Sequence, residues 1–157
     1  MLFRSEGDFG SGALDGVAFQ RKWEKLAYRA SGGYAPPTQL LGDFKAGRAS
    51  FALREVTPSC ARGYSFADLN SCLPSYICKS IIAATDIFAQ KIPVFNSFGS
   101  ILCGVETRTS SPVRIIRDES CNSSISGLMP CGEGAGYSGG ITSSAADGVR
   151  VAMGILK

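Results

Sequence analysis

The sequence contains no histidine among its 157 residues. Histidine is the usual base beside a serine or cysteine nucleophile and the commonest metal ligand, so such a site would need residues from elsewhere. Charged residues are also sparse at 18%, and the net charge of +3 comes from scattered lysines and arginines. We therefore expect no metal centre, no Cys–His pair and no nucleic-acid interface.

Long hydrophobic runs are also missing. The longest fully apolar run extends only from Ile81 to Ala84, whereas a membrane-spanning helix needs about 20 apolar residues. With an apolar content of 45%, the sequence instead predicts a soluble globular chain with no membrane span. It fits the cytoplasm or an organelle equally well.

The cysteines show no metal-binding or secretory pattern. No two of them are spaced as Cys-x-x-Cys, and no secretory hydrophobic segment precedes them. We expect reduced thiols that are buried or partly buried, and we interpret Cys131 as a packing residue because a lone thiol lacks a resolving partner. The six are Cys60, Cys72, Cys78, Cys103, Cys121 and Cys131.

Two helices are predicted in the first two thirds of the chain. Apolar residues recur at helical spacing from Val17 to Ala30, and Gly32-Gly33 is a typical helix end. A second helix is predicted between Pro74 and Gln90, with Ser75 as its N-cap. Between them, residues 34–59 are rich in proline and glycine and predict a loop with short strands.

The last third predicts short strands followed by a helix. Residues 101–107, 113–116 and 127–131 are β-prone. Beyond them, one apolar stripe predicts a terminal helix with a sheet or another helix packed against it; the stripe comprises Ile141, Ala145, Val149, Ala152, Met153 and Leu156. Gly148 and Gly154 within this helix predict close approach to a neighbouring backbone.

A glycine-rich segment joins the last predicted strand to the terminal helix. It consists of Gly132, Glu133, Gly134, Ala135, Gly136, Tyr137, Ser138, Gly139, Gly140 and Ile141. Glycines let backbone approach a flat ligand, and the free N–H groups of a helix start attract an electron-rich group. The pattern favours a ligand site in which Glu133 accepts hydrogen bonds from hydroxyls. Its alternative is a mobile loop beside a solvated glutamate.

Four motifs resemble one family. Residues 104–115 and 127–141 are similar to the C-terminal part of uncharacterised FAD-dependent dehydrogenases, in the broad glutathione-reductase-like flavoprotein group. Residues 16–21 and 42–44 also resemble that family's pattern, so the likeness covers nearly the whole chain.

The resemblance implies an α/β chain, with an α+β cap portion. The chain would be the C-terminal fragment of a Rossmann-like FAD/NAD(P)-binding flavoprotein. Residues 1–98 would form part of a substrate or cap domain, and residues 99–157 would return to the FAD-binding domain. The family's N-terminal Gly-x-Gly-x-x-Gly fingerprint, which seats the pyrophosphate on the first helix, is absent here. The glycines of residues 132–136 do not replace it, because the chain ends before the acidic residue expected about 20 positions later. The implied partners are therefore a missing N-terminal FAD-binding segment and a small-molecule substrate or electron acceptor.

The resemblance also implies a division of roles around an FAD cofactor. Gly132 and Glu133 would contact the ribityl chain, and Gly139, Gly140 and Ile141 would face the isoalloxazine ring. Between them, Gly134, Ala135, Gly136 and Tyr137 are also expected to contact the cofactor. The loop holding Thr107, Ser110 and Ser111 would face the ring or the substrate. Arg108 would steady an anionic substrate or acceptor. Arg114 and Arg117 are interpreted as surface residues that aid solubility.

Two other readings remain open. Residues 136–140 spell Gly-x-Ser-x-Gly, which predicts a serine hydrolase with Ser138 as nucleophile. A non-catalytic binding module is the second alternative. Under the flavoprotein reading, we predict electron or hydride transfer through FAD in the parent enzyme, whereas the isolated chain would bind FAD weakly or not at all.

Overall fold

The computed structural model describes residues 6–107 and 110–156, which form two compact units. One unit comprises residues 21–107, and the other combines residues 6–20 with residues 110–156. The boundary follows residue 107 rather than residue 98 because the strand formed by residues 101–103 completes the sheet of the first unit. That residues 1–98 form a cap and residues 99–157 return to a flavin domain stays a prediction.

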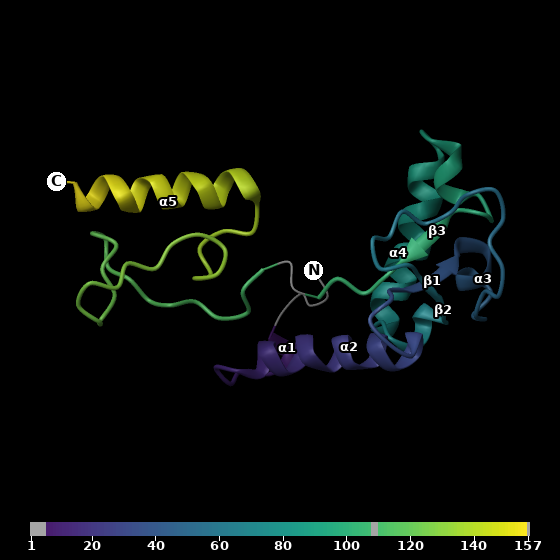
Figure 1. The fold of residues 1–157 in the computed structure, drawn as a ribbon, viewed down its shortest axis with the longest axis horizontal. Helices are drawn as coiled ribbons and strands as arrows, with labels where there is room; N and C mark the ends of the chain where they lie inside the picture. The colour runs from purple at the N-terminus through teal and green to yellow at the C-terminus, as the bar shows by residue number, and fades with distance from the viewer. Residues whose placement is uncertain (1–5, 108–109, 157) are drawn as a thin grey trace. The chain divides into compact units, whose positions relative to one another are not determined.

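The first long helix confirms the periodicity of the sequence. After the short α1 (Glu6–Phe9), α2 runs over Asp15–Ser31 (Figure 1). The Asp15 carboxylate accepts a hydrogen bond from the Gly12 N–H at 2.9 Å, which holds the chain ahead of the helix. At the other end Gly32 has φ +72°, and the Gly33 N–H donates to the Tyr28 carbonyl at 3.1 Å. The predicted glycine stop is therefore confirmed.

A mixed three-stranded sheet organises the unit of residues 21–107. The order is β2-β1-β3, in which β1 (Pro37–Leu40) pairs parallel with β2 (Ser65–Phe66) and antiparallel with β3 (Ile101–Cys103). Every residue of β1 is buried, as expected of a central strand. Short α3 (Leu41–Lys45) follows β1 directly. The mixed α/β class is confirmed, and the Rossmann-like portion stays a prediction.

Helix α4 covers Ser75–Ala89, close to the predicted bounds. The predicted cap is wrong, because Pro74 occupies the N-cap position, Ser75 is already helical, and no side chain caps the helix. The Pro74 carbonyl begins the helical hydrogen bonds by accepting from the Cys78 N–H at 3.1 Å. Two single-turn 3₁₀ helices flank α4, η1 (Leu69–Ser71) and η2 (Pro93–Asn96).

Side chains from α2, α3, η1 and α4 pack together into one apolar core. Phe44 and Leu41 are each only 1% exposed at its centre. Burial of such side chains supplies the main favourable term of folding, about 25 cal/mol for each Å² removed from water. The fully buried members are Ala27, Leu41, Phe44, Leu69, Cys72, Leu73 and Cys78.

The family-like motif at residues 42–44 has a structural purpose. A Cβ on Gly42 would clash with the Phe98 ring, so only glycine fits beneath it. Asp43 accepts hydrogen bonds from Arg48 Nε at 2.8 Å and from Ser50 Oγ at 2.7 Å, and Phe44 fills the core. Ser50 Oγ in turn accepts from the Leu40 N–H at 2.8 Å, which fixes the end of β1.

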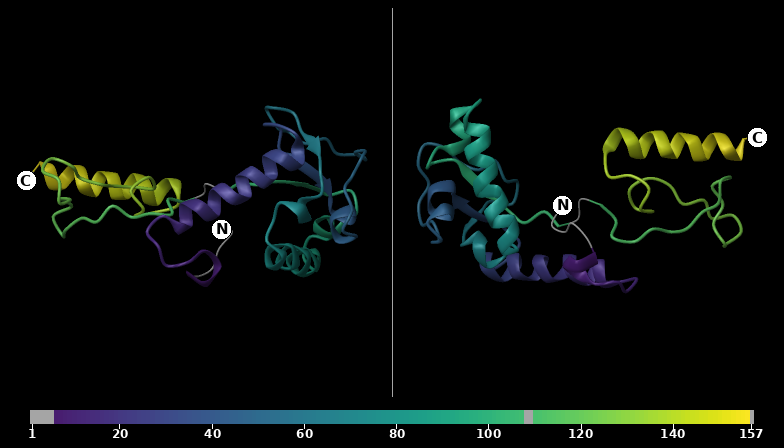
Figure 2. Two further views of the ribbon diagram at one scale, coloured as in Figure 1. Left: turned by 90° about the horizontal axis from the view of Figure 1, so that it is seen from below. Right: turned by 180° about the vertical axis from the view of Figure 1, so that it is seen from behind.

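In the other unit, α5 (Ile141–Ile155) lies alongside the coil of residues 110–140 (Figure 2). The predicted strands at residues 113–116 and 127–131 are wrong, because these residues are not assigned to any strand. Only isolated bonds link the coil segments, such as Ile115 N–H to the Ala135 carbonyl at 3.1 Å. The glycine segment therefore follows coil, and the expected strand–loop–helix order is reduced to a loop and a helix.

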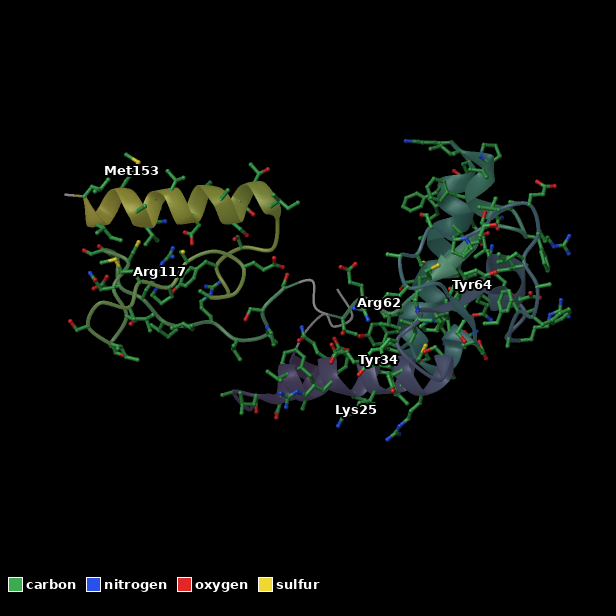
Figure 3. The ribbon with its side chains drawn as sticks, viewed as in Figure 1. Lys25, Tyr34, Arg62, Tyr64, Arg117 and Met153 are labelled. Atoms are coloured by element: carbon green, nitrogen blue, oxygen red, sulfur yellow. The ribbon has the colours of Figure 1, made fainter. Side chains whose placement is uncertain are left out.

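The apolar stripe of α5 is exposed, so the predicted packing on that side is wrong within the described residues. Ile141 is 94% exposed, Val149 and Met153 are 59% exposed, and Leu156 is 86% exposed. Figure 3 shows Met153 pointing away from the coil and Arg117 pointing toward the helix. Nothing lies within 4 Å of an added Cβ at Gly148 or Gly154, so the close backbone approach expected there is also wrong.

The reason is that α5 uses a different face. Val151 is buried, with 4% exposure, and Ser144 and Asp147 on the same side bond to the coil. The coil offers polar partners to Ser144 and Asp147, and this polar side of the helix turns inward. None of the helices in the described ranges combines the length and apolar character that crossing a membrane requires.

Candidate functional site

The glycine segment folds as a closed turn. The Gly136 N–H donates to the Glu133 carbonyl at 2.9 Å, and the Tyr137 N–H donates to the Gly132 carbonyl at 3.0 Å. Gly132 has φ +68° and Gly136 has φ +84°, a region in which other residues are strained. Two of the segment's five glycines are therefore required by its own backbone.

Gly136 is also packed tightly against the neighbouring coil. A Cβ there would fall 2.8 Å from the Arg114 Cα and would clash with the Val113 carbonyl oxygen. The Gly136 carbonyl accepts from Arg114 Nε at 2.9 Å, and Ala135 is buried. This side of the turn is closed by protein and leaves no room for a ligand.

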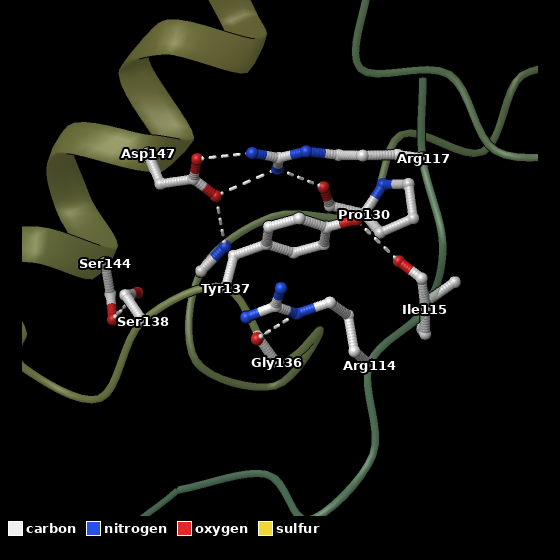
Figure 4. A network of polar contacts seen from close by, with 10 residues as sticks. Arg114, Ile115, Arg117, Pro130, Gly136, Tyr137, Ser138, Ser144 and Asp147 are labelled. Atoms are coloured by element: carbon white, nitrogen blue, oxygen red, sulfur yellow. Dashed lines mark hydrogen bonds and ion pairs between the residues drawn. The ribbon is translucent and has the colours of Figure 1, made fainter. Parts of the chain in front are cut away.

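An ion pair fastens the turn to α5 (Figure 4). Arg117 donates through Nη2 to Asp147 Oδ1 at 2.6 Å, through Nη1 to Asp147 Oδ2 at 2.9 Å, and through Nη1 to the Pro130 carbonyl at 2.6 Å. Asp147 Oδ2 also accepts from the Gly132 N–H at 2.9 Å. Hydrogen bonds from Arg117 and from the Gly132 N–H lower the pKa of Asp147 to about 2, and the same carboxylate raises the pKa of Arg117.

Tyr137 lies between two guanidinium groups. Arg117 stacks on its ring at 3.6 Å from the centroid, and Arg114 lies on the other side at 5.0 Å. The Tyr137 hydroxyl donates to the Ile115 carbonyl at 2.9 Å. Cation–π and hydrogen-bond contacts therefore hold Tyr137 in the protein. Among the predicted cofactor contacts, Gly136 and Tyr137 have mainly structural partners.

Interpreting Arg117 as a surface residue for solubility was wrong. Its side chain is only 5% exposed, because it pairs with Asp147. Sequence reasoning overlooked Asp147 entirely. The available signal was that Asp147 is the one acidic residue within Ile141–Ile155, on the side away from the apolar stripe.

The other side of the turn is open. Glu133 and Gly134 are exposed, no described residue bonds the Glu133 carboxylate, and an added Cβ on Gly134 would meet nothing within 4 Å. Gly139 and Gly140 are also exposed. Four predicted contacts thus lie at the surface.

The first turn of α5 retains free donors. The Gly140 N–H donates to Ser143 Oγ at 3.2 Å, which occupies the N-cap amide. Within residues 6–107 and 110–156, the backbone N–H groups of Ile141 and Thr142 have no acceptor. Unsatisfied first-turn donors carry the positive end of the helix dipole, which favours an electron-rich ligand.

One residue of the loop predicted to face the substrate, Ser110, lies close to Gly139, just before α5. The Ser110 Oγ lies 2.7 Å from where a Gly139 Cβ would stand, and the Ser110 carbonyl accepts from Gln20 Nε2 at 3.2 Å. Ser111 instead donates to the Val113 carbonyl at 2.7 Å. Thr107 is buried in the unit of residues 21–107. The catalytic candidate Arg108 lies outside the described residues.

Ser138 does not have the surroundings of a hydrolase nucleophile. Its Oγ lies 2.7 Å from Ser144 Oγ and shares a hydrogen bond with it. A nucleophile elbow follows its strand directly, whereas coil precedes Ser138 and the chain contains no histidine base. The geometry therefore favours a structural role for Ser138.

A separate cavity lies in the unit of residues 21–107. Its volume is about 530 Å³, within the usual range for small-molecule sites. The rings of Tyr28 and Tyr34 meet edge to face beside it at 5.1 Å, and Lys25 and Arg29 also line it. It is a second concave place at which a small molecule could be held.

Comparisons with known proteins bear on the identity of the chain. Residues 2–109 match the family model described as "FAD-dependent protein, C-terminal domain-like". An uncharacterised protein of Clostridium beijerinckii is 46% identical over 156 residues, which cover 98% of this chain but only 29% of that relative. The chain thus spans less than a third of the length of the relative that it matches. The match over residues 2–109 shows that the chain belongs to the family of FAD-dependent proteins with this C-terminal domain, whose cofactor is FAD.

Proposed function

We propose that this chain is part of an FAD-dependent oxidoreductase and supplies the ribityl and isoalloxazine side of the flavin site. The observation that carries the proposal is the open side of the glycine turn. There, Glu133 and Gly134 are exposed, and exposed Gly139 and Gly140 with the free amides of Ile141 and Thr142 follow in the same segment. Donors, an acceptor and exposed glycine backbone thus occur within one short stretch of the chain.

The chemistry of these groups fits FAD. The carboxylate of Glu133 can accept hydrogen bonds from ribityl hydroxyls. The N–H groups of Ile141 and Thr142 suit the N1 and C2-carbonyl edge of the ring, where negative charge collects. Gly139 and Gly140 lack the side chains that would keep the ring away. Once bound, FAD would supply electron or hydride transfer, while these residues bind and orient it.

The remainder of the flavin site would come from the missing N-terminal FAD-binding segment. The exposed stripe of α5 supports this proposal, because a monomeric protein rarely leaves such a contiguous apolar surface uncovered. The Clostridium beijerinckii relative also extends well beyond the matched residues. We assign the exposed face of α5 to packing against that segment, in the Rossmann-like domain that the sequence predicts.

Alone, the chain would bind FAD weakly and be inactive. Its one Gly-x-Gly-x-x-Gly run, residues 134–139, follows coil rather than a strand and packs against Arg114. It therefore lacks the strand–loop–helix setting in which that motif anchors the pyrophosphate of dinucleotides. The structure gives the alternative of a serine hydrolase no support, because Ser138 has no base.

The test uses a full-length protein that carries this segment. In it, Glu133→Ala should raise the FAD dissociation constant about tenfold or more, since a lost hydrogen bond to a charged group is worth about 1.5–3 kcal/mol. FAD absorbance of the protein peak after gel filtration and fluorescence titration of the apoprotein would measure this. Glu119→Ala is the matched control, because Glu119 is an exposed carboxylate of the same unit. Equal FAD retention in both variants would remove Glu133 from the site.

A further inference from the structure

Two cysteines far apart in the sequence meet at the surface of the unit of residues 21–107. The sulfur atoms of Cys60 and Cys103 lie 3.9 Å apart, although 43 positions separate them in the chain. Both are free thiols; Cys103 is exposed and Cys60 is partly exposed. Solvent reagents can therefore reach a pair of sulfurs that already touch.

The two thiols are held in different ways. Cys103 ends β3 and pairs in register with Thr38 of β1. Thr38 Oγ1 donates to the Pro36 carbonyl at 3.2 Å and lies 3.4 Å from the Cys103 sulfur. Cys60 begins a tight turn in which its carbonyl accepts from the Gly63 N–H at 3.0 Å. One sulfur therefore belongs to the sheet, and the other to a turn outside it.

The other cysteines lack this combination of contact and access. Cys72 and Cys78 are buried and donate to the carbonyls of Leu69 at 3.7 Å and Leu73 at 4.0 Å. Burial raises the pKa of Cys72 to about 11 and raises that of Cys78, so both remain inert thiols. Cys131 is exposed but has no sulfur contact within the described part of the chain.

We propose that Cys60 and Cys103 form a reversible intrachain disulfide by exchange with a low-molecular-weight disulfide such as oxidised glutathione. This site is separate from the glycine turn and does not depend on flavin binding. Formation of the bond would tie the loop that follows α3 to the edge strand β3.

The exchange proceeds in two balanced steps. The Cys103 thiolate attacks one sulfur of the small disulfide, forming a mixed disulfide and releasing one thiolate. Cys60 then loses its proton and attacks the Cys103 sulfur, forming the Cys60–Cys103 bond and releasing the second thiolate. The protein loses two electrons and two protons, and the small disulfide becomes two thiols.

The surroundings favour Cys103 as the thiol that attacks first. Cys103 is the more exposed of the pair, so a disulfide in solution reaches its sulfur more readily. Desolvation, followed by the contact with Cys103, raises the pKa of Cys60, which suits a resolving thiol that acts second. A disulfide needs a sulfur separation of about 2.05 Å, which rotation of the side chains and a small shift of the turn at Cys60 would bring about.

The test equilibrates the chain in buffers of reduced and oxidised glutathione, traps free thiols with N-ethylmaleimide, and measures intact mass and peptide maps. The unmutated chain and the Cys131→Ser control should each carry two fewer N-ethylmaleimide groups than their fully reduced forms, lack two further hydrogen atoms, and yield linked peptides containing Cys60 and Cys103. Cys60→Ser should instead accumulate one glutathione on Cys103, and Cys103→Ser should form no link from Cys60.

Excess reduced glutathione should restore all free thiols of the oxidised chain. The proposal fails if oxidising buffer leaves Cys60 and Cys103 unlinked, or joins other cysteines as readily as these two. The peptide map of the unmutated chain decides this even if a serine variant does not fold, and circular dichroism identifies such a variant.

Discussion

The unit of residues 21–107 and the unit that contains α5 are stabilised in opposite ways. The first surrounds Leu41 and Phe44 with apolar side chains from several helices and the sheet. The second joins a coil to one helix through the Arg117–Asp147 pair and backbone bonds of the glycine turn. The apolar stripe of α5 faces solvent.

The difference indicates which unit is complete. A unit with a closed apolar core gains most of its stability from burial and can fold alone. Ion pairs and turns specify geometry but add little net stability. We infer that the unit of residues 21–107 is self-sufficient, whereas the unit containing α5 acquires its full stability only when its apolar stripe is covered.

The largest effect is expected from opening the core. Phe44→Ala should reduce the free energy of unfolding of the first unit by about 3–5 kcal/mol, because it leaves a cavity among buried side chains. Denaturant unfolding followed by circular dichroism measures the loss. Phe51→Ala is the matched control, since Phe51 is 89% exposed, and it should change stability by less than about 0.5 kcal/mol. Equal effects would mean that the core is not closed around Phe44.

A smaller effect is expected in the glycine turn. Gly136→Ala should destabilise the second unit by more than about 1 kcal/mol, because φ is positive and the new Cβ would clash with Val113. Gly134→Ala should leave stability unchanged, because its Cβ would point into open space. Amide hydrogen exchange across residues 110–156 distinguishes the two. If Gly134→Ala proved the more damaging, the open and closed sides of the turn would be wrongly assigned.

The ion pair predicts a response to acid that is confined to the second unit. Because the folded pKa of Asp147 is lowered from 3.8 to about 2, its contribution is complete above about pH 4 and is lost as the pH falls toward 2. Hydrogen exchange of residues 110–156 should therefore accelerate over that interval. Asp147→Asn should show faster exchange already at neutral pH and a weaker acid response. An unchanged response would exclude Asp147 as the titrating group.

The smallest effect is expected on the exposed stripe. Met153→Gln should change the free energy of unfolding by less than about 0.5 kcal/mol, because Met153 is 59% exposed. Val151→Gln, on the buried face of the same helix, should destabilise the unit more. In a full-length relative the order of these two destabilising effects should change, because Met153 would then be covered by the additional segment. Insensitivity to Met153→Gln there would argue against our assignment of the stripe.

Local sequence patterns were sufficient to predict those features whose residues all lie within one segment of the chain. Apolar periodicity predicted α2, α4 and α5 nearly to the residue, and Gly32 ended α2 as expected. The strands at residues 113–116 and 127–131 failed because β-prone residues form a strand only beside a pairing partner, and none is provided there. The same limitation left Asp147 unnoticed, since its partner lies 30 residues away.

The sequence by itself determined the helices, the glycine turn and the membership in an FAD-dependent family, because these follow from short-range spacing and motif. Only the tertiary structure decided which glycines of the turn are packed and which are open, which face of α5 turns inward, and that Cys60 meets Cys103. Those outcomes depend on contacts between residues remote in the chain, and composition or periodicity carries no record of which remote segments will meet.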